Sequence, residues 1–345
     1  MNVRLQRLTT QDETSSPDTG LTSIEICAGA GGQALGLEWA GFEHVALVEI
    51  DAWSCTTLRH NRPDWNVIQQ DLHTFSGHPY EGVDLLAGGV PCPPFSVAGH
   101  KRGHLDERDL FPQALRLVEE TAPRAVMLEN VRGLLAPEFT GYREEIDAQL
   151  RSLGYYPRWK LLNASDYGVP QLRPRAVMVA LREEYADRFS WPVPNLAAAK
   201  TVGEALKEEM GSWGWPQAAE WAAQAATIAP TLVGGSRKHG GPDLGPTRAR
   251  KAWAQLGVNG ISLADEPPGP DFSGMPRLTV QMTTILQGFP LDWKIMGRKT
   301  PAYRQVGNAF PPPVAAAVAG AIRAALVTPG PQPVLQATRI LQEVP

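Results

Sequence analysis

The sequence predicts an α/β protein with a doubly wound, mostly parallel sheet and a smaller, irregular second domain. Short apolar segments alternate with amphipathic stretches from residue 23 to about residue 195. Beyond Trp191–Pro194 this alternation fades into a region rich in Gly and Pro. Strands that alternate with helical patterns are typical of a parallel sheet that has helices on both faces.

The expected elements follow from the apolar pattern, taken in chain order. Strands are expected at 24–27, 45–50, 67–70, 83–86, 125–128 and 176–180, and helices at 33–40, 111–120, 142–153 and 314–326. Residues 195–299 are expected to have little regular structure of their own, and a loop ending in three prolines is expected before the last helix. The predicted domains are 23–195 with 300–326 and, separately, 196–299, between mobile tails at 1–22 and 327–345.

Composition excludes several classes of protein. The chain has 345 residues, 43% of them hydrophobic and 20% charged, which is enough for a sizeable core and unlike a disordered chain. No uncharged apolar run reaches the ~18 residues needed to cross a bilayer, and the N-terminus lacks the order of a signal peptide. The three cysteines have neither a disulfide framework nor zinc-ligand spacing. We expect a soluble, cytoplasmic protein without a metal.

The charge is unevenly distributed along the chain. Residues 1–150 carry 11 Lys and Arg against 22 Asp and Glu, whereas residues 151–345 carry 21 against 14. Basic residues gather between 236 and 251, against the single acid Asp243: Arg237, Lys238, Arg248, Arg250 and Lys251. A local basic cluster can bind phosphates, and it can equally be a solvated loop, so charge alone leaves both interpretations open.

A glycine-rich turn indicates a nucleoside site. Residues 28–32 (Ala-Gly-Ala-Gly-Gly) follow an expected strand and open a helix, and Glu49 ends the next strand. An acid at this place can accept hydrogen bonds from both ribose hydroxyls. Asp71 follows the third strand, within reach of an adenine amino group. An NAD-dependent oxidoreductase fits this turn as well.

A cysteine between prolines is the candidate nucleophile. Cys92 lies in Pro91-Cys92-Pro93-Pro94, directly after a strand, and the prolines stiffen the loop around its thiol. Ligands of doubly wound sheets bind at the carboxyl ends of the strands, so this thiol should face the same cleft as the glycine turn. Cys27 and Cys55 lie on apolar faces and are interpreted as packing residues.

An acid and two arginines are expected at the same edge. Glu129 follows the expected strand 125–128 and could deliver a proton to a ring nitrogen. Arg173 and Arg175 are two apart on an extended segment, so both point to one side. They could hold a phosphate or a base carbonyl, and they could equally form salt bridges to the acidic first half.

The order of these motifs resembles the DNA cytosine-5 methyltransferases. The glycine turn, Pro-Cys, Glu-Asn-Val, Gln-x-Arg-x-Arg, Gln287-Gly-Phe-Pro290 and Gln305-Val-Gly-Asn-Ala309 occur in that order with fitting spacing. The resemblance covers residues 23–326 except most of 196–276. It implies a Rossmann-like methyltransferase domain, S-adenosyl-L-methionine as methyl donor, S-adenosyl-L-homocysteine as product, and a target-recognition domain at 196–299.

The resemblance also implies a role for each candidate residue. Cys92 is implied to be the nucleophile, Glu129 the group on cytosine N3, Arg175 the contact to the base O2, and Arg173 a supporting or phosphate contact. Ser96, Arg237, Lys238, Arg248 and Arg250 are implied to contact DNA. The implied cofactor contacts are Cys27, Ala28, Gly29, Ala30, Gly31, Gly32, Glu49, Ile50, Asp71, Leu72, Pro91, Leu110 and Asn308.

The chain departs from the family pattern, and other activities stay possible at this point. The usual Asp-x-Phe before the glycine turn is Glu25-Ile26-Cys27 here, which removes an aromatic contact to adenine. A tRNA cytosine methyltransferase and a catalytically silent DNA-binding module are the alternatives. The insert of about 100 residues before Gln287 favours a DNA-reading enzyme. We expect double-stranded DNA as partner, a restriction endonuclease as genetic partner, a monomer, and no membrane.

Overall fold

A seven-stranded, mostly parallel sheet forms the centre of the first lobe, as the sequence predicts. The computed structural model describes residues 20–91, 109–195, 199–234 and 241–328. The strands are β1 (Thr22–Ile26), β2 (Glu43–Glu49), β3 (Val67–Gln69), β4 (Leu85–Gly88), β5 (Ala125–Val131), β6 (Tyr155–Asn163) and β7 (Pro174–Arg182). Their order is β3-β2-β1-β4-β5-β7-β6. The first five are parallel, and β7 is antiparallel to both β5 and β6.

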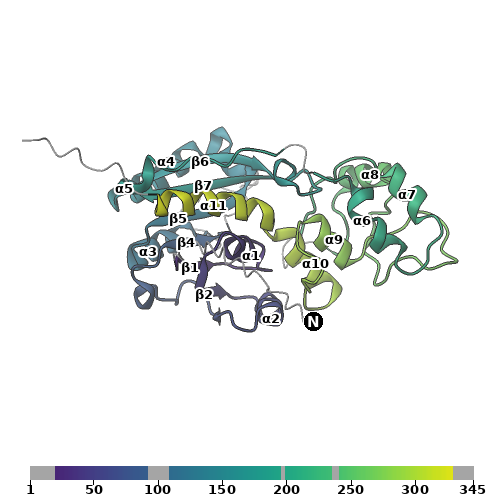
Figure 1. Ribbon diagram of the computed structural model, residues 1–345, viewed down its shortest axis with the longest axis horizontal. Helices are drawn as coiled ribbons and strands as arrows, with labels where there is room; N and C mark the ends of the chain where they lie inside the picture. Colours follow the sequence, from purple (N-terminus) through teal and green to yellow (C-terminus); the bar gives the residue numbers. More distant parts are fainter. Residues whose placement is uncertain (1–19, 92–108, 196–198, 235–240, 329–345) are drawn as a thin grey trace, which may run out of the picture.

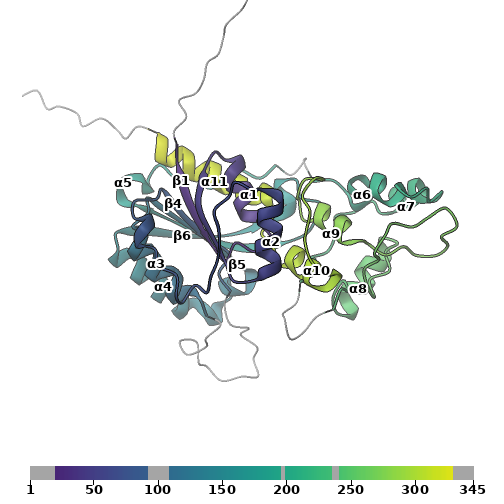
Figure 2. The same ribbon diagram turned by 90° about the horizontal axis from the view of Figure 1, so that it is seen from below.

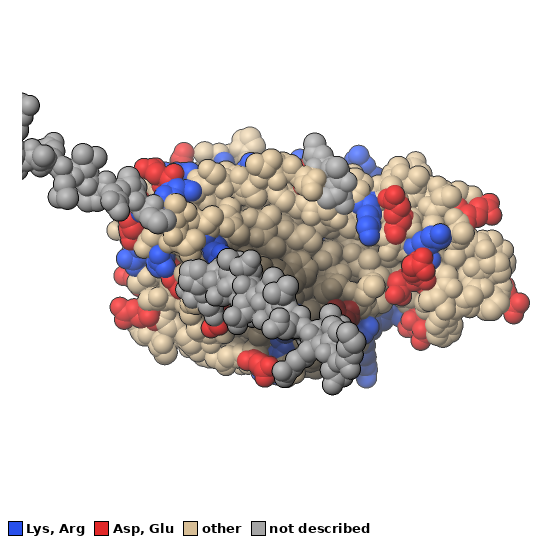
Figure 3. All heavy atoms as spheres, in the orientation of Figure 1, with Lys and Arg blue, Asp and Glu red and all other residues tan. Residues whose placement is uncertain are grey.

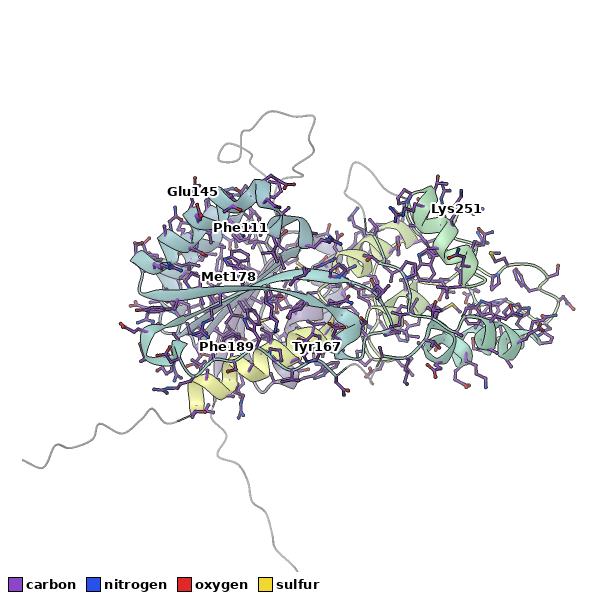
Figure 4. The ribbon with its side chains drawn as sticks, turned by 90° about the horizontal axis from the view of Figure 1, so that it is seen from above. Phe111, Glu145, Tyr167, Met178, Phe189 and Lys251 are labelled. Atoms are coloured by element: carbon purple, nitrogen blue, oxygen red, sulfur yellow. The ribbon has the colours of Figure 1, made fainter. Side chains whose placement is uncertain are left out.

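Helices cover both faces of this sheet (Figure 2). One face carries α1 (Gly32–Trp39), α5 (Glu183–Ala186) and α11 (Pro312–Val327), and the other carries α3 (Phe111–Thr121) and α4 (Thr140–Ser152). In Figure 4, Phe111 and Phe189 lie on opposite sides of the sheet strand that carries Met178. Each face therefore has its own apolar core, which fixes the strand ends between two packed layers.

The last helix, expected at 314–326, is present as α11 and packs beside the glycine-turn helix α1. A Cβ at Gly36 of α1 would lie 2.4 Å from Ala315 Cβ and 2.6 Å from Pro312 O, so the two helices meet backbone to backbone. The stretch Lys299–Val327 is long and apolar enough to cross a membrane by composition. It is divided at Pro311, however, and its apolar side chains are buried in the sheet core, as in a core helix.

The second lobe has more regular structure than the sequence indicates (Figure 1). It contains α6 (Val202–Gly211), α7 (Ala218–Gln224), α8 (Thr247–Gln255) and α9 (Val280–Leu286), joined by irregular segments. Their core includes Trp215, Trp221 and Trp253. The expectation of little regular structure was wrong, because the short helices are held by these long-range contacts and lack a long periodic pattern of their own.

Three further elements were missed. The expected loop before Pro311 is the helix α10 (Lys299–Asn308), whose Tyr303 and Val306 complete the core of the second lobe. The other two are α2 (Ala52–Asn61) and the edge strand β6. Short 3-10 turns occupy His78–Tyr80, Arg132–Leu135, Pro137–Phe139 and Ala164–Tyr167. Of the expected tails, most residues lie outside the described ones, although β1 begins at Thr22 and α11 ends at Val327.

Candidate active site

A cavity of about 370 Å³ lies at the carboxyl ends of β1, β2, β4 and β5. This is the edge at which doubly wound sheets bind their ligands, and the volume is in the range of small-molecule sites. Ten of the predicted cofactor contacts line it: Cys27, Ala28, Gly29, Ala30, Gly32, Glu49, Ile50, Pro91, Leu110 and Asn308. The structure therefore brings together segments from residue 27 to residue 308.

The glycine turn is shaped mainly by protein neighbours. Gly31 has a φ of 82°, and a Cβ on it would lie 2.6 Å from Leu58 and 2.9 Å from Trp293. A Cβ on Gly32 would lie 2.1 Å from Phe310 O. We expected glycines for close approach to a ligand, and at these two positions they allow close approach to the Trp293 and Phe310 segments. The Gln287–Pro290 motif thus supports the turn from behind, because Phe289 stacks on Trp293.

Glu49 is prepared to accept hydrogen bonds in the cavity. Its Oε2 accepts from Gly29 N at 2.7 Å, and its Oε1 accepts from Ile50 N and Asp51 N at 2.8 and 2.7 Å. Burial raises the pKa of this carboxyl, and the three backbone N–H groups oppose that shift. A carboxylate has about four acceptor sites, so these bonds orient Glu49 and leave capacity for a ligand hydroxyl.

Three predicted cofactor residues lie outside the lining of the cavity. Besides Gly31, these are Asp71, which is bound through its Oδ1 to His73 Nδ1 at 2.9 Å, and Leu72, which is buried in the sheet core. Their contact with an adenine stays a prediction. Cys27 both packs on that core and lines the cavity, and its φ of 53° is unusual for a residue with a side chain.

Among the residues that the structure describes, two acceptor atoms in the cavity wall have no hydrogen-bond partner. Glu25 and Gln33 are 1% and 3% exposed, and Glu25 Oε2 and Gln33 Oε1 are buried without a donor. Burial, and then the charge of Glu49, raise the pKa of Glu25. The lining has four acids, Glu25, Glu49, Asp51 and Glu129, and one Arg or Lys, Arg304. A ligand with cationic N–H donors, such as an ammonium group, would satisfy this wall.

Glu129 and Arg175 form a buried ion pair at the edge of the cavity. Arg175 Nε lies 2.7 Å from Glu129 Oε1, and both side chains are about nine-tenths buried. Glu129 is inside β5 and not after it, and β7 runs antiparallel to β5, which brings the start of β7 to the end of β5. Burial raises the pKa of Glu129 despite the two arginines nearby. A carboxyl with a raised pKa takes up a proton more readily, and such a proton can be donated to a ring nitrogen.

Arg173 is a supporting residue, and the phosphate contact expected as its alternative role was wrong. Its guanidinium is fully buried and donates to Leu232 O at 2.8 Å and to the carbonyls of Gly307 and Ala309. Gln171 beside it donates to Leu286 O and accepts from Leu232 N. This part of the motif therefore joins the two lobes, whereas Arg175 pairs with Glu129, which lines the cavity.

The predicted nucleophile and part of the predicted DNA-binding set lie outside the described residues. These are Cys92, Ser96, Arg237 and Lys238. Pro91, bonded to Cys92, lines the cavity, and a Cβ on Gly89 would lie 3.2 Å from Glu129 Oε2. Arg248 is exposed and Arg250 is half-buried on α8. On the face in Figure 3, the described acidic and basic residues of the second lobe are interspersed, without a continuous basic patch.

Several residues of the cavity were missed by sequence reasoning. Arg304 and Gln305 precede Asn308 on α10, and Asp51 and Ser54 begin α2. Arg304 and Asn308 are four apart and so lie on one face of a helix. This spacing would have found Arg304 had the segment been predicted as a helix. The Arg304 guanidinium lies 3.6 Å from the Asp51 carboxylate.

The strand order and the cavity at the strand ends define an α/β enzyme of the methyltransferase fold. Residues 21–324 match the family model of the C-5 cytosine-specific DNA methylases, and the chain belongs to this family. The chain is a DNA (cytosine-5)-methyltransferase.

Relatives and solved structures agree with this assignment. The Type II methyltransferase M.NgoMIV of Neisseria gonorrhoeae is 57% identical over 88% of this chain and 98% of its own length. The Type II methyltransferase M.NaeI of Lentzea aerocolonigenes is 56% identical over 89% of this chain and 75% of its own. Among solved structures, the S. pombe Dnmt2 methyltransferase covers 89% of the chain with a TM-score of 0.62 at 18% identity, which shows the shared fold.

Proposed function

We propose that this enzyme methylates C5 of one cytosine in a specific duplex DNA sequence, with S-adenosylmethionine as donor, as the modification half of a Type II restriction system. The names of its relatives support the restriction role. A cognate endonuclease would be its genetic partner, and the chain would act as a monomer in the cytoplasm, on the nucleoid. The observation that carries the proposal is that Glu129, paired with Arg175 in a buried ion pair, shares one cavity with Glu49 and Pro91.

The cofactor supplies the methyl group, and residues of this chain make cytosine reactive toward it. Cytosine C5 is a poor nucleophile within the aromatic ring. Addition of the Cys92 thiolate to C6, with a hydrogen bond from Glu129 to N3 and from Arg175 to O2, gives an enamine whose C5 can attack a methyl group. Loss of the C5 proton then breaks the C6–S bond and restores the ring. The base must leave the helix for this chemistry, because stacking covers C5 and C6.

Each part of S-adenosylmethionine can be assigned to residues of the cavity. Glu49 would accept from the ribose hydroxyls, and Asn308, Pro91 and Leu110 would contact the remainder. Asp71 and Leu72 at the end of β3 would meet the adenine. The acidic wall that includes Glu25 suits the two cationic groups.

The second lobe, residues 196–299, would read the DNA. Arg237, Lys238, Arg248 and Arg250 are the proposed contacts, with Ser96 on the target strand. The segment that carries Arg237 and Lys238 leaves the described structure at Gly234, whose added Cβ would lie 2.6 Å from Asn308 Oδ1. The chain therefore enters its basic segment beside a residue of the cavity. Phosphate contacts would position the lobe, and contacts to base edges would give the sequence preference.

Trapping with 5-fluorocytosine tests the proposal. Fluorine at C5 cannot leave as a cation, so after methyl transfer the thioether to C6 persists. Duplex DNA with 5-fluorocytosine at the target, found first by bisulfite sequencing of DNA from an expressing host, should give a covalent adduct that requires S-adenosylmethionine. The adduct should map to the Cys92 peptide, and Cys92→Ala should abolish it.

The control variant is Cys55→Ala, since that thiol is buried in α2. It should retain trapping and methylation. An adduct on Cys27 or Cys55, or full activity of Cys92→Ala, would overturn the mechanism. Transfer to tRNA in preference to duplex DNA, assayed side by side, would overturn the substrate.

A further inference from the structure

Gln33 contributes one of the two unsatisfied acceptors in the cavity wall, and nothing in the mechanism above uses it. It is the second residue of α1, and its side chain passes down onto the sheet, where Nε2 donates to Met127 O at 3.5 Å. That contact fixes the amide orientation, because a carbonyl oxygen accepts only from the NH₂ end. The Oε1 atom is therefore the end left without a donor.

Gln33 and Glu25 line the same cavity and meet the same face of the sheet. Glu25 of β1 pairs with Ala87 of β4, and Ala87 pairs with Met127 of β5. Residues paired in this way point to the same face, and neighbouring strands are about 5 Å apart. Gln33 therefore contacts the sheet two strands from Glu25, with the small side chain of Ala87 on the strand between them. Two buried acceptors thus border one cavity.

A ligand for this part of the cavity must bring hydrogen-bond donors, and preferably positive charge. Buried acceptors without partners are costly, and a carboxylate of raised pKa beside an amide oxygen is best satisfied by an ammonium group. The donor molecule has one such group, on its methionine part. The carboxylate of the same methionine part would be repelled by Glu25 and by the Gln33 oxygen.

We propose that Gln33 binds the α-ammonium group of the methionine part of the donor through its side-chain oxygen, opposite the negative charge of Glu25. This assignment rests on the proposed function of the cavity. It makes Gln33 a binding residue whose contribution is specific to one functional group of the ligand.

The assignment is tested by binding of ligands that differ in that group, measured by calorimetry on the full-length chain without DNA. The probes are S-adenosylhomocysteine, its decarboxylated analogue S-adenosyl-3-thiopropylamine, and 5′-methylthioadenosine, which lacks both ammonium and carboxylate. Gln33→Met keeps the length of the side chain and removes the acceptor. It should weaken the first two ligands about 10- to 100-fold, as expected for a hydrogen bond to a charged group, and leave 5′-methylthioadenosine unchanged.

Stability gives an independent readout. Gln33→Met removes both an unsatisfied buried oxygen and the 3.5 Å contact to Met127 O, effects of opposite sign, so the melting temperature of the ligand-free variant should stay close to that of the wild type. Gln33→Glu retains an acceptor and should rescue S-adenosylhomocysteine binding relative to Gln33→Met. Gln149→Leu, at an exposed position of α4, is the matched control and should change neither measurement.

Each other result counts against the inference. Equal weakening of all three ligands would show that Gln33 only shapes the cavity. Unchanged binding of all three would show that its oxygen meets no ligand. If the wild type binds none of the probes, the proposed function of the cavity fails first, and the inference fails with it.

Discussion

The two lobes of this enzyme are stabilised in different ways. In the first lobe, five parallel strands in register place their carboxyl ends along one edge, and apolar layers on both faces fix that edge. In the second lobe, short helices and irregular segments surround a smaller core rich in tryptophan. This difference indicates which lobe suits catalysis and which suits DNA recognition. The sheet gives the fixed geometry that bond-making needs, and the loops of the second lobe can change sequence without disturbing that geometry.

The largest expected effect is at the edge of the sheet. Glu129→Gln should lower the methylation rate about 10²- to 10⁴-fold, because the amide cannot supply a proton to N3 in the activated state. DNA affinity should change much less, since Glu129 is buried and paired with Arg175. Single-turnover methylation and DNA binding are measured in parallel. Equal loss of both would indicate a structural glutamate.

Glu144→Gln is the control for this comparison. Glu144 is exposed on α4, so the same chemical change there should leave both measurements unaltered.

A substitution in the core of the second lobe should act by lowering the stability of that lobe. Trp253 is fully buried in its core, so Trp253→Ala should lower the free energy of unfolding by about 3–5 kcal/mol, followed by urea denaturation. DNA affinity should fall more than affinity for S-adenosylhomocysteine, because most of the cavity belongs to the first lobe. Trp213→Ala, at a side chain that is 53% exposed, is the control. Equal loss of both affinities would show that the lobes are not separable.

The same contrast explains what the sequence could predict. In the first lobe the pattern predicted six of the seven strands and the carboxyl-end cavity, because local periodicity and sheet geometry suffice there. It placed Glu129 after its strand, because β7 extends the pairing to Val131. Burial of Arg173 depends on Leu232 and Gly307, contacts that no local pattern contains. The helices of the second lobe were missed for the same reason.

Charge on α8 should distinguish two kinds of DNA contact. Figure 4 shows Lys251 on α8 at the rim of the second lobe, and Arg248 is exposed one turn away. Replacing Arg248, Arg250 and Lys251 by Ala should reduce DNA affinity, and the slope of log K against log salt should flatten by about 0.9 for each phosphate that the variant no longer neutralises. Lys200→Ala with Lys207→Ala is the control in the same lobe.

Two other results would change the role assigned to Arg248, Arg250 and Lys251. A loss of sequence discrimination with an unchanged salt slope would mark base contacts. No change in either would make α8 a solvated surface.

The smallest expected effect is at Glu25 of β1, which is buried and lines the cavity together with Gln33, Cys27 and Glu49. Burial raises its pKa above the ordinary value of 4.5, so the unfolded chain releases this proton at lower pH than the folded chain does. Stability is then lost as pH rises through the window above about 4.5. Glu25→Gln removes the titration, and the ligand-free variant should gain ~1–2 kcal/mol over the wild type at pH 8 and little at pH 5. With S-adenosylhomocysteine bound, the wild type should be more stable than Glu25→Gln, because the ammonium group of the ligand stabilises the ionised carboxylate of the wild type. Thermal denaturation at both pH values, with and without the ligand, measures the two effects, with Glu144→Gln as the control. A gain in stability that is the same at both pH values, or one that the ligand does not reverse, would show that Glu25 faces no cation. The two lobes would then differ in architecture but not in the charge of the binding site.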